Sequence, residues 1–467
     1  MELSPTKIKS YVKEALGDDH LKAAVDRATQ TALTKRLDKV NQMPYWEELR
    51  YKTHSIKRDV IEHLDEYLQE FEANCIKNGI KVHWAQDAKE ANDIIYQIAQ
   101  DNDVKTIVKS KSLTTEELHL NKFLIKHGIE TLETDLGEYI VQLMDQIPSH
   151  LTAPALHLTR KDIGKVFHEK LDVEYTEDPS ELTMIARAKL REKFLAADMG
   201  ISGVNFAIAE SGAVTVVENE ANAALTVALP RVHVAVMGIE KLIPKMADLA
   251  YFLRMLGPSA TGQKATSYVH IISGSLDSEK QEGPKQVHIV LLDNGRSKIL
   301  ADPHLRELLF CIRCGACLNT CPIYQQIGGH AYGWVYMGPI GAALIPSYLG
   351  TKVGKAAPFL SSLCGACFQI CPMRINLPHH LLTLRNRVVD DGESMLVERI
   401  AINGWAFLAK RPWLYRFATW FPGKFQKLLP KDKAFPAPGW GKDRPLARFD
   451  SKGFRNRFKE MERKKAK

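Results

Sequence analysis

The sequence lacks the features that mark secreted and membrane proteins. Its N-terminus, MELSPTKIKSYVKEALGDDH, is polar, of mixed charge, and has no apolar signal-peptide core. One charge-free stretch, 331–351, is long enough to cross a bilayer. Because six glycines and prolines interrupt it, a buried, turn-rich connector explains this stretch better than a membrane span. We therefore expect a cytoplasmic protein.

Cysteine is scarce outside one segment. Of the eight cysteines, seven lie between residues 311 and 371, and Cys75 stands alone. A chain of 467 residues with no secretory start is not expected to depend on disulfides. In the reducing cytosol, clustered cysteines usually bind metal. Cys75 has no other cysteine near it in the sequence, and we expect it to be a small buried hydrophobic residue.

The first cysteine run is Cys311-x2-Cys314-x2-Cys317-x3-Cys321, followed directly by a proline. Three thiolates at this spacing suit three corners of one [4Fe–4S] cluster, and the fourth cysteine, before the helix-breaking proline, is directed to a second cluster. Zinc sites usually pair two Cys-x2-Cys arms, so four cysteines in one run match zinc poorly. The run therefore predicts iron–sulfur binding.

A second run, Cys364-x2-Cys367-x3-Cys371, also followed by proline, repeats the first but has Ser361 at the first ligand position. We expect the last cysteine of each run to cross over to the other cluster. The predicted ligands are then Cys311, Cys314, Cys317 and Cys371 for the first cluster, and Cys321, Cys364 and Cys367 for the second. The second cluster is therefore one thiolate short.

Three outcomes stay open for the incomplete corner. Ser361 could bind iron as an alkoxide, although a hydroxyl is a far weaker acid than a thiol. The fourth iron could instead be held by water, a substrate or a partner, or the cluster could be of the [3Fe–4S] type. The plainest alternative is that Ser361 only fills space. In each case two clusters in one small module favour electron transfer over a catalytic pocket.

The sequence pattern divides the chain into four parts. Residues 1–70 are expected to be helical, and 71–300 to form an α/β domain with a mixed sheet. Residues 301–395 are expected to form an α-helical, ferredoxin-like module with the two clusters, and 396–467 a basic, aromatic tail. Strands rich in β-branched residues are expected at 105–110, 205–209, 214–218, 233–238 and 268–273.

Start and turn signals give finer predictions within the α/β part. Asp178-Pro179-Ser180-Glu181 is a helix start, and this helix is expected to continue to Gly200. Two hairpins are expected, one at 205–218 around Glu210-Ser211-Gly212 and one at 287–300 with Asn294-Gly295 at its turn.

The sequence resembles the lactate utilization protein B family, the iron–sulfur subunit of a three-protein L-lactate oxidation system. The matching stretches are VKSKS (108–112), ETDLGEYIVQL (133–143), GVNFAIAESGAV (203–214), LLDNGRSKIL (291–300), CIRCGACLNTCP (311–322) and IGGHAYGWVYMGPIGA (327–342). The resemblance implies two [4Fe–4S] clusters, cytoplasmic location, other lactate-utilization subunits as partners, and a LUD domain over 71–300 related to the sugar-phosphate isomerase and CoA-transferase group. It does not supply the ligand at Ser361 or the redox acceptor.

The residues themselves suggest an anion site in the α/β domain. Lys109 and Lys111 follow a predicted strand, where ligands gather in open α/β sheets, and lysine binds carboxylates or phosphates. Glu210 could act as acid, base or nucleophile. The alternatives are two solvated lysines at a strand end and a plain turn residue. Because no Rossmann fingerprint or P-loop occurs, we expect a partner to share any oxidoreductase chemistry, and leave open whether this chain is an enzyme.

The positive charge of the chain is concentrated in its tail. The whole chain carries +8, but residues 401–467 hold 18 Lys/Arg against 5 Asp/Glu, a local charge of +13. Between 405 and 429 basic residues alternate with aromatic ones, and Leu414, Phe417 and Phe421 fall on one helical face. Such a helix docks on a partner or lies on an anionic membrane surface. Nucleic acid is not expected, because no binding motif accompanies it.

Overall fold

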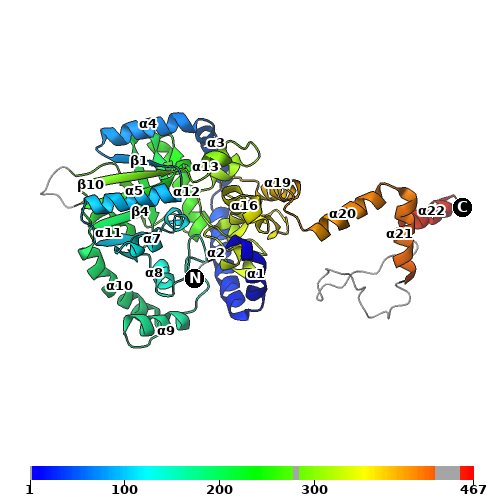
Figure 1. Cartoon of the computed structure of the whole chain (residues 1–467), viewed down its shortest axis with the longest axis horizontal. Coiled ribbons are helices and arrows are strands. Elements are labelled where there is room, and N and C mark those ends of the chain that lie inside the picture. The colour runs from blue at the N-terminus through cyan, green and yellow to red at the C-terminus, as the bar shows by residue number, and fades with distance from the viewer. Residues whose placement is uncertain (1–2, 277–282, 426–452, 467) are drawn as a thin grey trace. The chain divides into compact units, whose positions relative to one another are not determined.

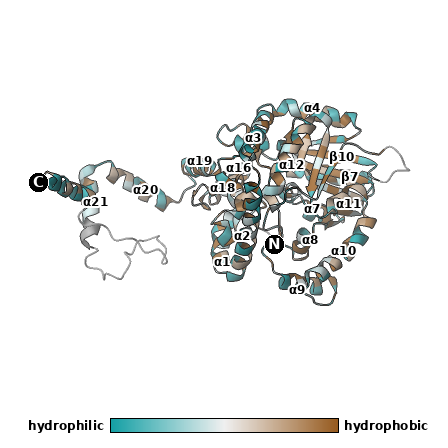
Figure 2. Cartoon of the chain, turned by 180° about the vertical axis from the view of Figure 1, so that it is seen from behind, coloured by the Kyte–Doolittle hydropathy of each residue, from teal (hydrophilic) through white to brown (hydrophobic). Residues whose placement is uncertain are grey.

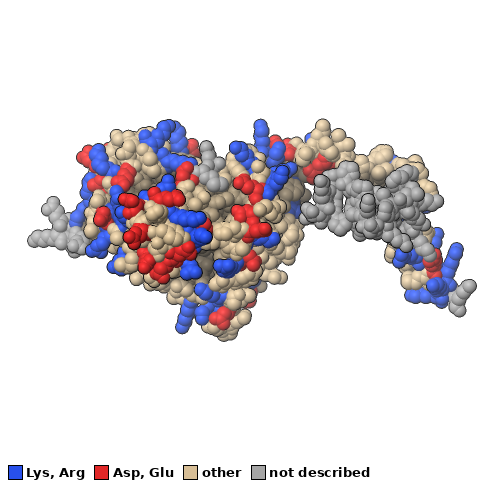
Figure 3. All heavy atoms as spheres, turned by 90° about the horizontal axis from the view of Figure 1, so that it is seen from below, with Lys and Arg blue, Asp and Glu red and all other residues tan. Residues whose placement is uncertain are grey.

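A computed structural model describes residues 3–276, 283–425 and 453–466, with the side chains of 421–425 left aside (Figure 1). The chain divides into two compact units, Met1–Glu393 and Ser394–Lys467. Lys/Arg and Asp/Glu are interspersed over the visible face of the first unit, and no patch of one sign dominates it (Figure 3).

The N-terminal part is helical, as predicted. It consists of η1 (Pro5–Lys7), α1 (Ile8–Leu16), α2 (Asp19–Asn41), α3 (Trp46–Glu62) and α4 (Leu64–Lys77). The Asp18 side chain caps α2 by accepting a hydrogen bond from the Leu21 amide. Val60 and Ile61 of α3 are buried, and so is Cys75 of α4, whose thiol lies against the Gly212 carbonyl. The expectation that Cys75 is a buried residue is confirmed.

Six parallel strands form the larger sheet of the α/β part. They are β1 (Lys81–Ala85), β2 (Thr106–Lys109), β3 (Glu130–Glu133), β4 (Met199–Gly203), β7 (Val232–Gly238) and β10 (Gln286–Leu292), in the order β1-β10-β7-β4-β2-β3. Ala235 and Met237 of β7 join one hydrophobic core, and Val234 and Val236 join another. This alternation is what a strand buried on both faces requires, and the central strands are accordingly apolar (Figure 2).

A smaller sheet mixes parallel and antiparallel pairs. It contains β5 (Phe206–Ile208), β6 (Ala213–Glu218), β8 (Leu242–Ile243) and β9 (Tyr268–Ile272), in the order β8-β5-β6-β9. The pair β5–β6 is the hairpin predicted at 205–218, and its turn is η2 (Ala209–Ser211) with Gly212 at φ +65°. The mixed α/β character predicted from the sequence is confirmed, and the antiparallel pairs are confined to this sheet.

The second predicted hairpin is wrong. After β10 the chain enters α13 (Arg296–Leu300) and does not turn back as a strand. The Asp293 side chain accepts hydrogen bonds from the amide and the hydroxyl of Ser297, which starts the helix. Because β10 already lies between two parallel neighbours, β1 and β7, no edge is free for an antiparallel return.

Helices fill the connections between the strands. They are α5 (Ala88–Asp101), α6 (Leu113–Glu117), α7 (Leu120–Lys126), α8 (Leu136–Leu143), α9 (Arg160–Leu171), α10 (Pro179–Ala196), α11 (Asn222–Ala228), η3 (Ile239–Lys241) and α12 (Met246–Thr261). The start of α10 is confirmed, because Asp178 caps it through the amides of Ser180 and Glu181. Its predicted continuation to Gly200 is wrong, because Met199 begins β4.

The cysteine runs lie in a series of short helices. These are η4 (Arg306–Phe310), α14 (Ala316–Asn319), α15 (Tyr324–Ile327), η5 (His330–Tyr332), α16 (Gly338–Leu349), α17 (Thr351–Gly354), η6 (Ala357–Phe359), α18 (Ala366–Ile370) and α19 (Leu377–Asp390). The charge-free stretch 331–351 is mostly buried and contains α16. Among the described residues no helix is long and apolar enough to span a membrane.

The second unit contains α20 (Leu396–Ala409), α21 (Pro412–Phe425) and α22 (Gly453–Lys465). Large apolar side chains on α20 and α21 are exposed, among them Trp405, Trp413, Phe417 and Trp420. The prediction that Leu414, Phe417 and Phe421 share a face is tested only in part, because the side chains of Phe421 and Lys424 lie outside those described.

Candidate functional site

The two cysteine runs have the same backbone. In the first, Arg313 and Gly315 take positive φ angles of 59° and 76°, and in the second Leu363 and Gly365 take 56° and 87°. Each glycine then precedes a short helix, α14 or α18, and these two helices pack together. The sequence repeat is therefore also a structural one.

The two runs bring their cysteines together across the sequence. Burial raises the pKa of Cys314 to about 12, and the charges of Cys371 and Cys311 add to this effect. Burial likewise raises the pKa of Cys367 to about 12, and among the thiols the charges of Cys321 and Cys364 add most to this effect. Cys371 thus lies beside the first run, and Cys321 beside the second.

Cys317 connects the two groups of cysteines. Burial is the largest cause that raises the pKa of Cys317. The charges of four cysteines from both runs, Cys311, Cys314, Cys367 and Cys371, raise it further. Among the residues described, no three His, Cys, Asp or Glu side chains are arranged around a point that would hold a single metal ion. A [4Fe–4S] cube places its four cysteine ligands on four separate irons, so its ligands surround a larger volume.

Ser361 occupies the position in its loop that Cys311 occupies in the first. The Cys311 sulfur accepts a hydrogen bond from the Arg313 amide at 3.4 Å, and the Ser361 hydroxyl oxygen accepts one from the Leu363 amide at 3.1 Å. The side-chain oxygen therefore points as the equivalent sulfur does. The Ser361 carbonyl accepts a further bond from Arg385 at 2.7 Å, which holds the loop against α19.

Two arginines from the N-terminal helices contact the second cysteine run, and no sequence pattern indicated either of them. Arg50 on α3 donates from Nε and Nη2 to the Cys371 carbonyl at 3.0 and 2.9 Å. Arg36 on α2 donates to the Ile370 carbonyl at 2.8 Å, and its charge is attracted by Cys314. Both side chains are buried. The helices of residues 1–70, which carry no chemical motif, thus form part of the wall around these cysteines.

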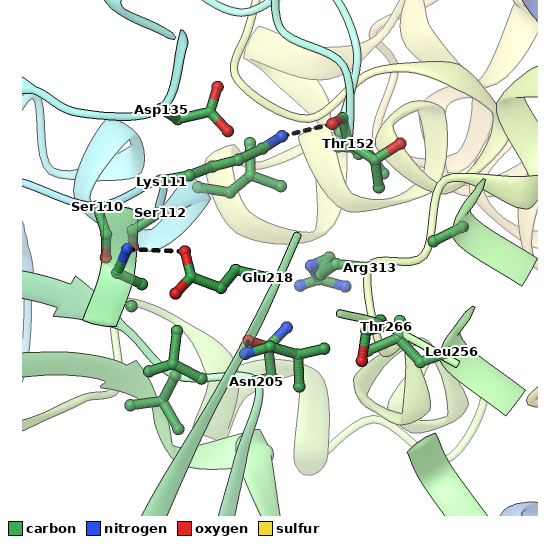
Figure 4. A pocket seen from close by; sticks show the side chains of 18 of the residues that line it. Ser110, Lys111, Ser112, Asp135, Thr152, Asn205, Glu218, Leu256, Thr266 and Arg313 are labelled. Atoms are coloured by element: carbon green, nitrogen blue, oxygen red, sulfur yellow. Dashed lines mark hydrogen bonds between the residues drawn. The ribbon is translucent and has the colours of Figure 1, made fainter. Parts of the chain in front are cut away.

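A cavity of about 240 Å³ lies at the carboxyl ends of β2 and β4, the position expected for a ligand in an α/β sheet. Ser110 and Lys111 follow β2, and Gly203 ends β4. The opposite wall includes Ile312 and Arg313, from the loop between Cys311 and Cys314. The cavity therefore joins the α/β sheet to the first cysteine run (Figure 4).

The predicted site residues of the α/β domain have different positions relative to this cavity. Lys111 lines it and donates to the Thr152 carbonyl at 2.5 Å (Figure 4). Lys109 does not line it, and its buried amine pairs with Glu133 at 2.6 Å and Glu116 at 3.3 Å. Burial opposes the charge on Lys109, but these carboxylates hold its pKa above the ordinary value.

Glu210 lies outside the cavity. It is exposed at the hairpin turn, where its side chain accepts a hydrogen bond from the Met246 amide at 3.0 Å. The structure therefore brings Lys111 to a cavity and gives Lys109 and Glu210 structural contacts. The roles predicted for these two as anion site and acid or base gain no support from their surroundings.

A buried network of charges lies behind the cavity. Arg296 donates to both oxygens of Glu117 at 2.9 and 3.0 Å and to Glu240 at 2.6 Å. Burial alone would raise the pKa of Glu240, but Arg296, Lys241 and Arg313 beside it lower this pKa to about 2. Loss of hydration lowers the pKa of Lys57 to about 7 and that of Lys241 to about 8.

This network holds more basic groups than acidic ones. Its bases are Lys57, Lys241, Arg296 and Arg313, and its carboxylates are Glu117 and Glu240. The charge of Cys311 acts on three of the bases, Lys57, Lys241 and Arg313. The donor set thus fits an iron–sulfur cluster: thiolates grouped in a buried region, with a surplus of positive charge beside them.

Three family models match the chain: a LUD domain over residues 68–292, a 4Fe-4S dicluster domain over 307–375, and Lactate utilisation protein B, C-terminal, over 385–463. A solved structure, a DUF162 family protein from Deinococcus radiodurans, covers 49% of this chain and 98% of its own, at 13% identity and a TM-score of 0.29. This last similarity is too low to support an argument.

Relatives with the same description match over nearly their whole lengths. Lactate utilization protein B of Bacillus velezensis is 39% identical, with 100% of this chain and 99% of the relative covered. The Bacillus subtilis protein is 40% identical (99% and 98% covered), and that of Geobacillus kaustophilus is 41% identical (96% and 95% covered). With this identity over whole chains, the protein belongs to the lactate utilization protein B family.

Proposed function

We propose that this chain is an electron-transfer subunit of a system that oxidises L-lactate, and that it holds two iron–sulfur clusters in a helical, ferredoxin-like module. The observation that carries the proposal is the packing of α14 against α18, which brings the two cysteine runs together, with Cys371 acting on the pKa of Cys314 and Cys321 on that of Cys367. The dicluster family model over 307–375 supports the same cofactor class. When bound, the clusters would accept and release single electrons.

The ligand sets that we propose are those expected from the cysteine spacing, and the approach of the two runs supports them. The first cluster would be held by Cys311, Cys314, Cys317 and Cys371, and the second by Cys321, Cys364 and Cys367. The second is one thiolate short, so it is either [3Fe–4S] or has a non-cysteine ligand. Ser361 is the candidate on this chain, because its hydroxyl has the orientation of the Cys311 sulfur.

Basic residues of the chain would stabilise the first cluster. Four thiolates around a cube leave a net negative charge, and burying that charge is costly without compensation. Arg36 on α2, Arg50 on α3 and Arg313 in the first cysteine run provide this compensating charge. Because the exposed Cys364 lies in the second run, the second cluster would be the nearer of the two to solvent.

We infer the substrate from the names of the relatives, and the contact with partners from the tail. The relatives are named for lactate utilization, and the sequence shows no nucleotide or flavin fingerprint. Other subunits of a cytoplasmic lactate-utilization system would therefore share the chemistry. The exposed aromatic side chains of α20 and α21, with basic residues among them, suit docking on such a subunit. Contact with an anionic membrane surface is the alternative, and nucleic acid is not proposed.

Iron and sulfide analysis with EPR on anaerobically purified protein tests the cofactor. About eight irons per chain support two cubes, and about seven with an oxidised-state [3Fe–4S] signal support an incomplete second cluster. Zinc without iron would refute the proposal.

Deletion of the gene tests the pathway. Loss of growth on L-lactate, restored by the intact gene, supports the assignment. Normal growth would favour the alternative, a two-cluster relay for a different dehydrogenase or reductase.

A further inference from the structure

Arg313 lies on the cavity wall and carries a buried charge. Its side chain is only 8% exposed, yet Nη1 and Nη2 have no hydrogen-bond partner among the described residues. The nearest carboxylate oxygen, Oε1 of Glu240, is 3.6 Å from Nη2, and the ring of Tyr336 lies 4.8 Å from the guanidinium carbon. A buried guanidinium with two free nitrogens is costly unless something binds it.

The guanidinium of Arg313 points into the cavity (Figure 4). A second buried polar group of the cavity, the Ser110 hydroxyl on the sheet wall, also has no partner in the part of the chain that the structure describes. Lys111 and Lys241 add positive charge. The cavity thus presents donors on two opposite walls, one from the α/β sheet and one from the first cysteine loop.

The carboxylates of the cavity are already used by the backbone. Glu218 accepts from the amides of Ala223 and Ala224 at 2.7 and 2.9 Å. Asp135 accepts from the Glu138 amide at 3.1 Å, and Glu220 from the Leu136 amide at 3.2 Å. They hold the ends of α11 and α8 and are not paired with Arg313. Three fixed negative charges in a small space also disfavour a dianion.

We propose that this cavity binds a small monocarboxylate, whose carboxylate group accepts hydrogen bonds from both free nitrogens of Arg313. A planar guanidinium with two free N–H groups matches a carboxylate in a bidentate pair. The inference rests on the proposed function in one respect: Cys311, two residues from Arg313, is taken as a ligand of the first cluster.

The position of Arg313 links binding in the cavity to the first cluster. An electron added to that cluster places one more negative charge beside Arg313 and therefore weakens its hold on the carboxylate. Linkage is reciprocal, so the bound carboxylate lowers the reduction potential of the cluster. For unit charges about 10 Å apart in a partly hydrated protein the expected coupling is about tenfold in affinity, or about 59 mV for a one-electron couple.

The test uses the cluster-loaded full chain under anaerobic conditions, with L-lactate, pyruvate and inorganic phosphate as probes in calorimetric titrations. We expect a carboxylate to bind the oxidised protein, with affinity about tenfold lower after reduction by dithionite. Arg313→Gln is expected to weaken binding at least about 30-fold. Arg160→Gln, which changes an exposed arginine on α9, serves as the control and should bind as the unchanged protein does.

Each outcome bears on one of the two proposals. Iron present but no carboxylate bound at several millimolar, or binding of phosphate alone, overturns the inference and leaves the proposed function standing. Equal affinity in both redox states overturns the link to the cluster. Absence of iron from the unchanged protein refutes the proposed function itself. If Arg313→Gln loses iron, carboxylate binding by the unchanged oxidised protein still decides the inference, and its redox dependence decides the link to the cluster.

Discussion

Replacing Arg50 with methionine removes the strongest contact between the N-terminal helices and the second cysteine run. Arg50 lies on α3 and is 7% exposed. Its guanidinium donates twice to the Cys371 carbonyl, at 3.0 and 2.9 Å, and once to the Phe368 carbonyl at 3.3 Å. Methionine fills similar volume but donates no hydrogen bond, so the Cys371 carbonyl stays buried without these donors.

The size of the effect follows from these contacts. Hydrogen bonds from a charged donor contribute about 1.5–3 kcal/mol each, and the new apolar packing offsets part of their loss. We expect the free energy of unfolding to fall by about 3 kcal/mol. For the 393 residues of the first unit, at about 2.1 cal/mol/K of unfolding entropy per residue, this corresponds to a fall in Tm of about 4 °C.

Anaerobic thermal unfolding followed by circular dichroism measures the shift, and absorbance near the cluster band measures loss of iron during incubation. Arg27→Met, which changes an exposed arginine on α2, is the matched control. Arg50→Met should lose iron faster than this control, because Cys371 is the proposed fourth ligand of the first cluster. Equal Tm and equal iron retention in the two variants would refute the role assigned to Arg50.

Three further predictions concern buried groups. Burial lowers the pKa of His233 from 6.5 to about 3, so the folded chain takes up this proton later than the unfolded chain as pH falls; denaturant titrations should show that the stability lost between pH 7 and 5 is about 2 kcal/mol smaller in His233→Gln than in the unchanged protein, and an unchanged loss would contradict the assignment. Glu117→Gln leaves Arg296 poorly paired and should lower the free energy of unfolding by about 3–5 kcal/mol in the same titrations; a cost under about 1 kcal/mol would show the pair to be unimportant. Cys75→Ala should keep the full iron content by chemical analysis, and a loss of iron would place Cys75 among the ligands.

The features predicted correctly from the sequence depend on residues close together in the chain. The cysteine spacing, the Asp178 helix start and the hairpin around Glu210-Ser211-Gly212 are local patterns, and a few residues decide them. The predicted hairpin at Asn294-Gly295 was also local, but it failed because β10 takes parallel neighbours from distant parts of the chain. The order of strands in a sheet depends on packing between distant segments, so it cannot be predicted from one segment alone.

The surroundings of the site could not be predicted for the same reason. Lys109 ends β2, near where an anion-binding lysine would lie, but Glu133 on the neighbouring strand β3 neutralises it. Arg313 lies in the motif CIRC, and its position between the two predicted ligands Cys311 and Cys314 can be seen in the sequence. Only the structure shows that its side chain faces a cavity of the α/β domain. Arg36 and Arg50 lie hundreds of residues from the Ile370 and Cys371 carbonyls that they contact.

Spectroscopy of single cysteine variants tests most directly whether two clusters share ligands across the runs. Anaerobic EPR with iron analysis would compare Cys371→Ala and Cys314→Ala with Cys321→Ala and Cys364→Ala. We predict that the first two alter one centre and the last two alter the other, although Cys371 lies in the second run and Cys321 in the first. Variants that sort by run, so that Cys371→Ala alters the same centre as Cys364→Ala, would contradict the proposed ligand sets, and a chain that binds zinc and no iron would contradict the account as a whole.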